Sequence, residues 1–315
     1  MKSVLSAPHF TNDDDARAMI ESIRWPSGPV CSHCGTVDHA YPVSGRAGLY
    51  RCAEPECRKD FTCTTGTVME RSKIALHKWM LAFYLLCSSK KGMSALQLKR
   101  HLGISYQSAW FLCHRIREAM RDGGFSPMGG PGSIVEADET YYGPVAKTKA
   151  RKTTTSGRPF TKSGRTGPSN KRAIVSLVER GGSVRSFHVA VADGASVAKI
   201  VRDNIDRETR LHTDESRLYT RVGSEFASHE TVNHSAKEYA RGDVNTNSVE
   251  GYFSIFKRGM KGVYQHCAEK HLHRYLAEFD FRYNHRIALG HSDVTRTVAA
   301  IKGAEGKRLL YGQPR

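Results

Sequence analysis

The sequence predicts an α/β protein in which a mixed sheet flanked by helices is preceded by a cysteine-rich ribbon and a helical segment. Three observations support this prediction. Two cysteine pairs lie within 31–57, helix-period apolar residues run through 73–120, and β-rich segments alternate with helical ones from 133 onward. Strands and helices that alternate in this order favour a sheet covered by helices.

The N-terminal segment predicts a short helix followed by a metal-binding ribbon. Asn12 and three aspartates precede an apolar stretch, which indicates a helix over 12–24 with acids at its positive end. CSHC at 31–34 and CAEPEC at 52–57 place two thiol pairs on tight turns, and the segment between them suits a hairpin. Four thiolates that converge from two such turns form the tetrahedral site that Zn²⁺ takes in structural roles. The predicted zinc ligands are Cys31, Cys34, Cys52 and Cys57.

The remaining cysteines are not expected to form disulfides. The N-terminus lacks the apolar core of a signal peptide, and the longest apolar run, 80–87, is too short to cross a membrane. We therefore expect a cytoplasmic, nucleoid-associated protein without a disulfide framework. Cys63 lies outside the zinc spacing, and it is expected, like Cys87, Cys113 and Cys267, to be a small buried side chain.

Residues 90–120 predict two short helices around a glycine turn. Ser94 and Ser105 can cap the two helices, and Gly103 suits the turn between them. This pattern is typical of a helix-turn-helix, although an ordinary helical hairpin has the same pattern. In a helix-turn-helix the first turn of the second helix would contact base edges. The residues of that turn are Tyr106, Gln107 and Ser108.

Glycines and prolines at 123–132 indicate a linker, after which the elements of the sheet follow. Strands are expected at 133–142, 171–182, 183–193, 210–216 and 228–235. Helices are expected at 195–205, from about 247, and at 269–289.

The charge pattern predicts a nucleic-acid partner. The chain has a formal net charge of +17 and a pI of about 9.6, which indicates a polyanionic partner. The segment 144–172 contains nine Lys and Arg residues and no acid. It is either a solvated loop or, as we favour, an arm that binds DNA. Its first four basic residues are Lys147, Lys149, Arg151 and Lys152.

Three acids in the sheet segment are candidates for a catalytic metal site. Asp138 lies in the middle of a strand, on one face with Glu136 and Thr140, where a carboxylate is costly to bury without a partner. Asp214 lies near the end of a short strand, and Glu250 lies at a helix start. Three carboxylates that meet repel one another unless cations bind, so this set predicts Mg²⁺ or Mn²⁺.

Glu250 and Lys257 also have simpler interpretations. If Asn247 is the N-cap of the helix, Glu250 is its third residue, and the two form a capping box with Asn in place of Ser or Thr. Lys257 lies two turns further on the same face, and it is either a surface lysine or a group that holds a phosphate near the metals.

The chain resembles bacterial insertion-sequence transposases that carry an N-terminal zinc ribbon and a ribonuclease-H-like DDE domain. The resemblance extends from about residue 13 to 300. Its segments are RWPSGPVCSHCG, VEADETYYG, LHTDES, HETVNHS, and NTNSVEGYFSIFKRGMKGVYQH followed by EKHLHRYLAEFDFRYNHR. It implies that Asp138, Asp214 and Glu250 are the metal-binding triad. It also implies that Lys257 is the basic residue seven positions after the glutamate. Some relatives have Asn or His as the third ligand, so Asn247 is an alternative to Glu250.

The resemblance also implies the partners and the reaction. The expected partners are double-stranded DNA, as inverted transposon ends and target DNA, and further copies of the chain assembled on it, without a membrane. The expected reaction is metal-dependent strand cleavage followed by strand transfer. The expected domains are 1–68 (helix and zinc ribbon), 69–125 (helix-turn-helix-like), 133–300 (DDE domain with the loop 144–172) and a basic tail at 301–315.

Three other functions remain as alternatives. His271 and His273 with Tyr275 and Tyr283 could belong to a nuclease that uses a tyrosine nucleophile, but that class needs its histidines on a strand and this segment has helical period. The chain could also be a non-catalytic DNA-binding protein derived from a transposase, or a nuclease of the same fold that does not join strands. Cleavage and joining assays distinguish these alternatives.

Overall fold

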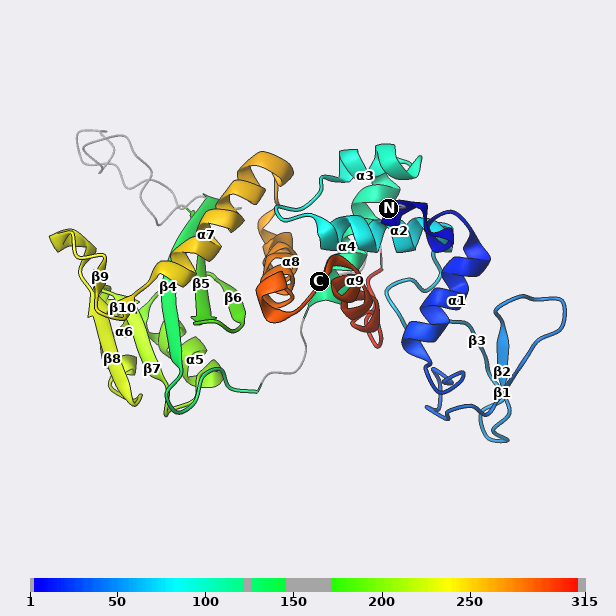
Figure 1. The fold of residues 1–315 in the computed structure, drawn as a ribbon, viewed down its shortest axis with the longest axis horizontal. Helices are drawn as coiled ribbons and strands as arrows, with labels where there is room; N and C mark the ends of the chain where they lie inside the picture. Colours follow the sequence, from blue (N-terminus) through cyan, green and yellow to red (C-terminus); the bar gives the residue numbers. More distant parts are fainter. Residues whose placement is uncertain (1–2, 122–125, 146–170, 311–315) are drawn as a thin grey trace, which may run out of the picture. The chain divides into compact units, whose positions relative to one another are not determined.

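The computed structural model describes residues 3–121, 126–145 and 171–310, and the chain divides into two compact units (Figure 1). The first unit contains Met1–Asp122 and His285–Arg315, and the second contains Gly123–Asn284. These limits do not coincide with the domain ends that we expect from the sequence, because the last helix belongs with the N-terminal segments. None of the helices in the described part of the chain is both long and apolar enough to cross a membrane.

The first unit begins with the predicted helix and ribbon. Asn12 caps α1 by accepting hydrogen bonds from the backbone N–H groups of Asp14 and Asp15, as the acid-rich start predicts. The ribbon is a three-stranded antiparallel sheet in the order β1-β2-β3. The elements are η1 (Val4–Ser6), η2 (Pro8–Phe10), α1 (Asp13–Arg24), β1 (Ala40–Pro42), β2 (Tyr50–Cys52) and β3 (Asp60–Phe61).

Four further α-helices and a 3₁₀ helix complete the described part of the first unit. α3 and α4 form the predicted pair: Ser94 and Ser105 cap them, and Gly103 has the left-handed conformation, φ +61°, in the turn between them. α2 contacts α1, α4 and α9, so the C-terminal helix joins the core of this unit. The elements are α2 (Leu76–Ser88), α3 (Ala95–Leu102), α4 (Tyr106–Met120), η7 (Ile287–Leu289) and α9 (Asp293–Lys302).

The second unit is built on a five-stranded mixed sheet in the order β6-β5-β4-β7-β8. β5 is antiparallel to both of its neighbours, β4 and β6, whereas β7 and β8 are parallel to β4 and to each other. This order and these directions are those of a ribonuclease-H-like domain. The strands are β4 (Ile134–Pro144), β5 (Lys171–Glu179), β6 (Val184–Val189), β7 (Arg210–Asp214) and β8 (Ser228–Val232).

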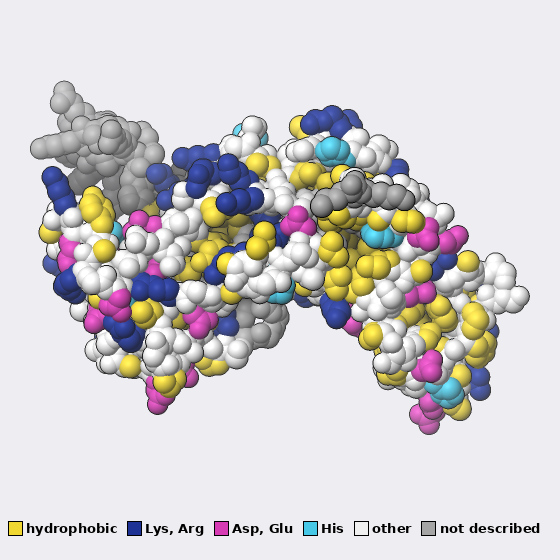
Figure 2. All heavy atoms as spheres, viewed as in Figure 1, with side chains coloured by type: hydrophobic (Ala, Val, Ile, Leu, Met, Phe, Trp, Pro, Cys, Tyr) yellow, Lys and Arg dark blue, Asp and Glu magenta, His cyan; other side chains and the backbone are white. Residues whose placement is uncertain are grey.

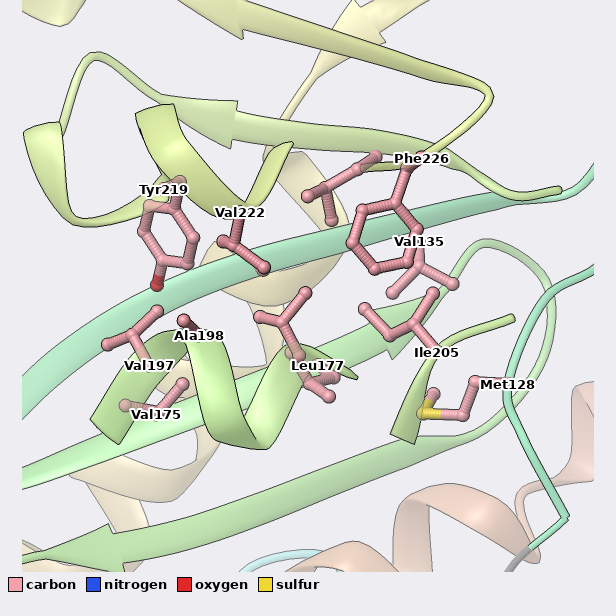
Figure 3. Close-up of a cluster of buried hydrophobic side chains, with 13 residues drawn as sticks. Met128, Val135, Val175, Leu177, Val197, Ala198, Ile205, Tyr219, Val222 and Phe226 are labelled. Carbon is pink, nitrogen blue, oxygen red and sulfur yellow. The ribbon is translucent and has the colours of Figure 1, made fainter. Parts of the chain in front are cut away.

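Helices cover both faces of this sheet, because its central strands are apolar on both sides. On β5, Val175 and Leu177 face α5 and α6, and Figure 3 shows their side chains packed with those of these helices. Ile174 and Val178 face the opposite side and pack under α7 and α8. The helices are α5 (Gly194–Asn204), α6 (Arg217–Gly223), α7 (Asn247–Gly259) and α8 (Leu272–Asn284).

Short elements connect the sheet to α7 and α7 to α8. α6 and the β9–β10 hairpin are elements that the sequence analysis does not predict, because each is too short to show a period. The predicted helix over 269–289 is interrupted: it begins as a 3₁₀ turn, and α8 ends at Asn284. The short elements are η4 (His234–Ala236), β9 (Ala240–Arg241), β10 (Val244–Asn245), the π-helix η5 (Met260–Tyr264) and η6 (Glu269–His271).

Two polar side chains of α8 hold the edge strand β6. The side-chain amide of Asn284 accepts a hydrogen bond from Val184 N (2.7 Å) and donates one to Val184 O (3.0 Å). The buried carboxylate of Asp280 accepts hydrogen bonds from Ser186 N (2.9 Å), Ser186 Oγ (2.8 Å) and the Tyr252 hydroxyl (2.5 Å). These bonds link α8, β6 and α7, so both residues are explained by structure alone.

Candidate active site

The two strand acids lie side by side because two parallel strands reach the same edge of the sheet. β4 and β7 pair in register only as far as Glu136 and His212. Two residues further along each strand are Asp138 and Asp214, where this pairing has ended while each strand still pairs with its outer neighbour. The carboxyl ends of parallel strands are where α/β sheets place ligand sites.

Three carboxylates meet at this point. Among the described residues, Asp138, Glu139 and Asp214 each offer an oxygen atom, and these atoms all lie within 4.8 Å of one another. Burial, together with the negative charges of Asp214 and Glu139, raises the pKa of Asp138 to about 8. Burial also raises the pKa of Asp214. The site therefore holds more negative charge than its surroundings solvate, a condition that a divalent cation relieves.

Glu139 is a member of this group that the sequence analysis missed. Side chains alternate along a strand, so Glu139 starts from the opposite face to Asp138. Its carboxylate accepts hydrogen bonds from the Tyr219 hydroxyl (3.0 Å) and from Ser216 Oγ (3.4 Å), on α6 and the residue that precedes it. The only sequence signal was its position next to Asp138.

Glu250 lies close to this group but outside it. Its negative charge contributes to the raised pKa of Asp138, after burial and the two nearer acids. Its carboxylate accepts a hydrogen bond from Thr246 Oγ1 (2.8 Å) and lies 3.4 Å from His234 Nε2, and its side chain is 48% exposed. Of the three predicted acids, the structure thus brings two together and holds the third at the rim.

The predicted capping box at the start of α7 is wrong. The N-cap is Thr246, whose side chain makes no capping bond, and Asn247 is the first helical residue. The backbone N–H groups of Ser248 and Val249 are instead satisfied by Glu136, a residue of β4 that is distant in sequence. A local capping rule cannot predict an acceptor that arrives from another element.

Lys257 lies on α7, two turns after Glu250, and its ammonium is near the acid group. Burial lowers the pKa of Lys257, whereas the negative charge of Asp138 raises it. The ammonium also lies 5.9 Å from the centre of the Phe253 ring. Lys257 is therefore a half-buried cation that interacts with Asp138, which differs from a freely solvated surface lysine.

The cysteine group fits a zinc ion. The four predicted thiols, and no other cysteine of the described residues, form one group with sulfur atoms within 4.8 Å of one another. The sulfurs of Cys31 and Cys57 are 3.7 Å apart, and those of Cys34 and Cys52 are 3.6 Å apart. A tetrahedron with zinc–sulfur bonds of about 2.3 Å has edges of about 3.8 Å, so the spacing matches zinc with no open position.

The predicted DNA-contacting residues lie in two places, the first turn of α4 and the segment 144–172. On α4, Tyr106 is 48% exposed and Gln107 is exposed, whereas most of the helix from Ala109 onward is buried. The first turn of α4 is therefore the most exposed part of this helix. The residues Lys147, Lys149, Arg151 and Lys152 lie outside the described residues.

Basic side chains also gather on α7. Figure 2 shows Lys and Arg side chains over the part of the second unit where Figure 1 draws this helix, and Arg258 on α7 and Lys261 on the following η5 are exposed. The His271–Leu272–His273 triplet ends η6 and begins α8, so it is not on a strand. The alternative of a tyrosine-nucleophile nuclease is therefore not supported.

The strand order, and the acids that lie where β4 and β7 stop pairing, define a ribonuclease-H-like domain with an acidic site. The family described as "ISXO2-like transposase domain" matches residues 129–284, and the family described as "Transposase zinc-ribbon domain" matches residues 11–60. The chain therefore belongs to the insertion-sequence transposases that carry these two domains.

Known proteins with similar sequence or structure were also found. The chain is 29% identical over 282 residues, 87% of its length and 91% of the relative's, to an uncharacterized protein in transposable element ISH50 of Halobacterium salinarum. Similar solved structures include a simian T-cell lymphotropic virus intasome in complex with PP2A regulatory subunit B56 gamma. That match has 14% identity and a TM-score of 0.29, and it covers 58% of this chain and 63% of that one, slightly under two thirds.

Two complexes of the Mos1 transposase are also similar. The strand transfer complex has 13% identity and a TM-score of 0.23 over 68% of this chain and 78% of that one. The paired-end complex with the left transposon end has 14% identity and a TM-score of 0.22 over 64% and 78%. At these TM-scores the fold assignment depends on the strand order and the family matches.

Proposed function

We propose that this chain is a catalytically active DNA transposase that cleaves the ends of its insertion sequence and joins them to target DNA. The observation that carries this proposal is the acid group in which oxygen atoms of Asp138, Glu139 and Asp214 lie within 4.8 Å of one another. Such a group is expected where a protein holds Mg²⁺ or Mn²⁺ for phosphodiester chemistry.

The residues present fit divalent metal ions. All the candidate ligand atoms are carboxylate oxygens, which Mg²⁺ and Mn²⁺ prefer, and the raised pKa of Asp138 reflects charge that a cation would neutralise. We propose Asp138, Asp214 and Glu250 as the ligands. When bound, two such ions supply activation of the attacking oxygen and stabilisation of the leaving oxygen.

The chain's own residues have distinct roles around this centre. Asp138 and Asp214 are held by the sheet, so their positions are rigid, whereas the exposed Glu250 can move toward a bound ion with little cost. Lys257, with its ammonium near Asp138, is placed to hold a phosphate oxygen of the scissile strand. No residue is required to form a covalent intermediate with DNA.

DNA binding is part of the same proposal. The two Mos1 complexes are a strand transfer complex and a paired-end complex with a transposon end, and we extend transposon-end binding to this chain. The exposed basic residues Arg258 and Lys261, on α7 and η5, support phosphate contacts. The first turn of α4 and the loop 144–172 are the proposed further contacts, and paired ends imply more than one copy of the chain.

The test is Mn²⁺-dependent cleavage of DNA that carries the element's own ends. Asp138→Asn and Glu250→Gln should bind this DNA as tightly as wild type but cut it at least a hundredfold more slowly, about 2.7 kcal/mol of barrier. Glu208→Gln, which neutralises an exposed acid of the same unit, is the matched control and should cut normally.

The outcomes separate the alternatives. If Glu250→Gln cuts normally while Asp138→Asn does not, the third ligand is another residue, and Asn247→Ala and Glu139→Gln become the variants to test. If the wild type binds ends and never cuts, the non-catalytic DNA-binding alternative gains support. If it cuts but a two-DNA assay shows no joined product, the chain is a nuclease.

A further inference from the structure

We propose that Glu136 is a positioning residue that locks the register of α7 on β4 and so holds Glu250 beside Asp138. The proposal rests on the function proposed above, because it concerns the same acid site. Glu136 itself is not a member of the acid group, and its side chain is completely buried.

Glu136 caps α7 from outside the helix. Its Oε2 atom accepts hydrogen bonds from the backbone N–H groups of Ser248 (2.7 Å) and Val249 (3.0 Å), and its Oε1 atom accepts one from Ser248 Oγ (2.9 Å). The first N–H groups of a helix have no partner within the helix, and its N-terminus favours negative charge. The buried carboxylate therefore satisfies the helix start and is attracted to it.

Arg180 completes the arrangement and connects it to the hairpin before α7. Its Nε and Nη2 atoms donate to Glu136 Oε1 at 3.0 and 2.8 Å. The same guanidinium donates to the backbone oxygens of Asp243 (2.8 Å) and Asn245 (3.2 Å). One carboxylate–guanidinium pair thus joins β4, the β9–β10 hairpin and the first turn of α7. Charge-assisted bonds of this kind are directional as well as strong.

The consequence for the active site follows from the geometry of strand and helix. Glu136 and Asp138 lie on the same face of β4, about 6.6 Å apart along the strand. Glu250 follows Val249, so the bonds at Ser248 and Val249 set which helical residue lies opposite Asp138. A slip of one residue would turn Glu250 by about 100° around the helix axis. The apolar packing under α7 is non-directional and resists such a slip less specifically.

The Glu250 side chain has its own contacts, but these do not set the register. Thr246 and His234 hold the carboxylate locally. Neither residue belongs to β4, so neither fixes α7 relative to Asp138. Among the described contacts between the β4 backbone or side chains and the first turn of α7, those of Glu136 are the hydrogen bonds that do so.

The experiment compares Glu136→Gln with Asp193→Asn in the full-length protein. Gln keeps the volume of the side chain but cannot accept at both oxygens. Asp193 caps α5 in the same unit by accepting from Ser196 N (2.8 Å), so its variant controls for the general loss of a helix cap. Three quantities are measured: amide exchange of the 246–253 peptide, Mn²⁺ affinity without DNA, and gel-shift affinity for transposon-end DNA.

We expect Glu136→Gln to speed amide exchange in 246–253 at least tenfold and to weaken Mn²⁺ binding by about 10- to 100-fold, the usual effect of removing a group that orients a metal ligand. DNA affinity should stay within about twofold of wild type, and Asp193→Asn should leave both the peptide and the Mn²⁺ affinity unchanged. Mn²⁺-dependent cleavage by Glu136→Gln should be partly restored by raising the Mn²⁺ concentration.

The positioning role is overturned if Glu136→Gln exchanges and binds Mn²⁺ like wild type, or if Asp193→Asn weakens Mn²⁺ binding equally. If Glu136→Gln does not fold, Glu136→Asp, which keeps the charge but withdraws it by one methylene, undergoes the same measurements. The failure of the proposed function looks different: wild type itself would neither bind Mn²⁺ nor cut. Even in that case, unchanged amide exchange at 246–253 in Glu136→Gln would refute the role of Glu136 in positioning α7.

Discussion

The acid site should make the metal-free protein less stable as pH rises, and Asp138→Asn should remove this loss. The pKa of Asp138 is about 8 in the folded chain, against 3.8 for an ordinary aspartate. The folded state therefore binds a proton more tightly than the unfolded state between these values. Stability that is fully present below pH 3.8 is then lost as pH rises through about 8.

The size of this loss can be worked out. Each pH unit between the two pKa values costs at most about 1.4 kcal/mol, and the loss levels off near the folded pKa. Between pH 6 and pH 8 the free energy of unfolding should fall by about 2 kcal/mol. Asn resembles the protonated acid, so the variant should lack this fall and be more stable than wild type at pH 8, although it does not cut DNA.

The assay must report on the second unit alone. All three tryptophans, Trp25, Trp79 and Trp110, belong to the first unit, so their fluorescence serves as an internal control. We would follow amide exchange of the β5 peptide in urea, in buffer without added divalent metal ions or chelator, at pH 6 and pH 8. An equal pH dependence of β5 protection in wild type and Asp138→Asn would refute the reasoning, as would a matching shift in tryptophan fluorescence.

Three further predictions concern other parts of the chain. Removing zinc with a chelator, or replacing Cys52 with Ser, should speed amide exchange throughout the ribbon strands and leave β5 protected. If exchange rises equally in β5, the structural role of zinc is not confined to the ribbon. Asp280→Ala should lower the free energy of unfolding of the second unit by about 3 kcal/mol, because it leaves buried hydrogen-bond donors without an acceptor. Chemical denaturation followed by circular dichroism measures this free energy. A loss of less than about 1 kcal/mol would contradict the prediction. Lys257→Ala should keep the Mn²⁺ affinity within about threefold of wild type but slow cleavage at least tenfold under single-turnover conditions. Lys257→Arg should retain most of the cleavage rate. An equal loss of rate in both variants would argue against a simple phosphate contact.

Much of the local structure could be predicted because its causes are local. The spacing of Cys31, Cys34, Cys52 and Cys57 determines which thiols can converge, and the structure confirms the group. Ser94 and Ser105 cap helices that follow immediately in sequence. Asp138 was assigned to a strand on its alternation with apolar residues, and the structure places it on β4.

The errors arose where the partner is distant in sequence. Asn247 has the right chemistry for a cap, but the N-cap is Thr246, and Glu136 reaches the N–H groups of Ser248 and Val249 from β4. Alternation puts Glu139 on the opposite face of the strand from Asp138, yet both carboxylates meet where β4 and β7 stop pairing. Neither the end of a strand pairing nor the arrival of a distant side chain leaves a local pattern.

The sequence by itself determined the ribbon, the order of the sheet elements and the identity of the strand acids, because periodicity, spacing and side-chain chemistry act over a few residues. Only the tertiary structure decided that Glu139 joins Asp138 and Asp214, that Glu250 lies at the rim, and that Glu136 holds α7. The physical reason is that each of these depends on how the backbone brings separate elements together, and directional contacts between distant residues are set only by the complete fold.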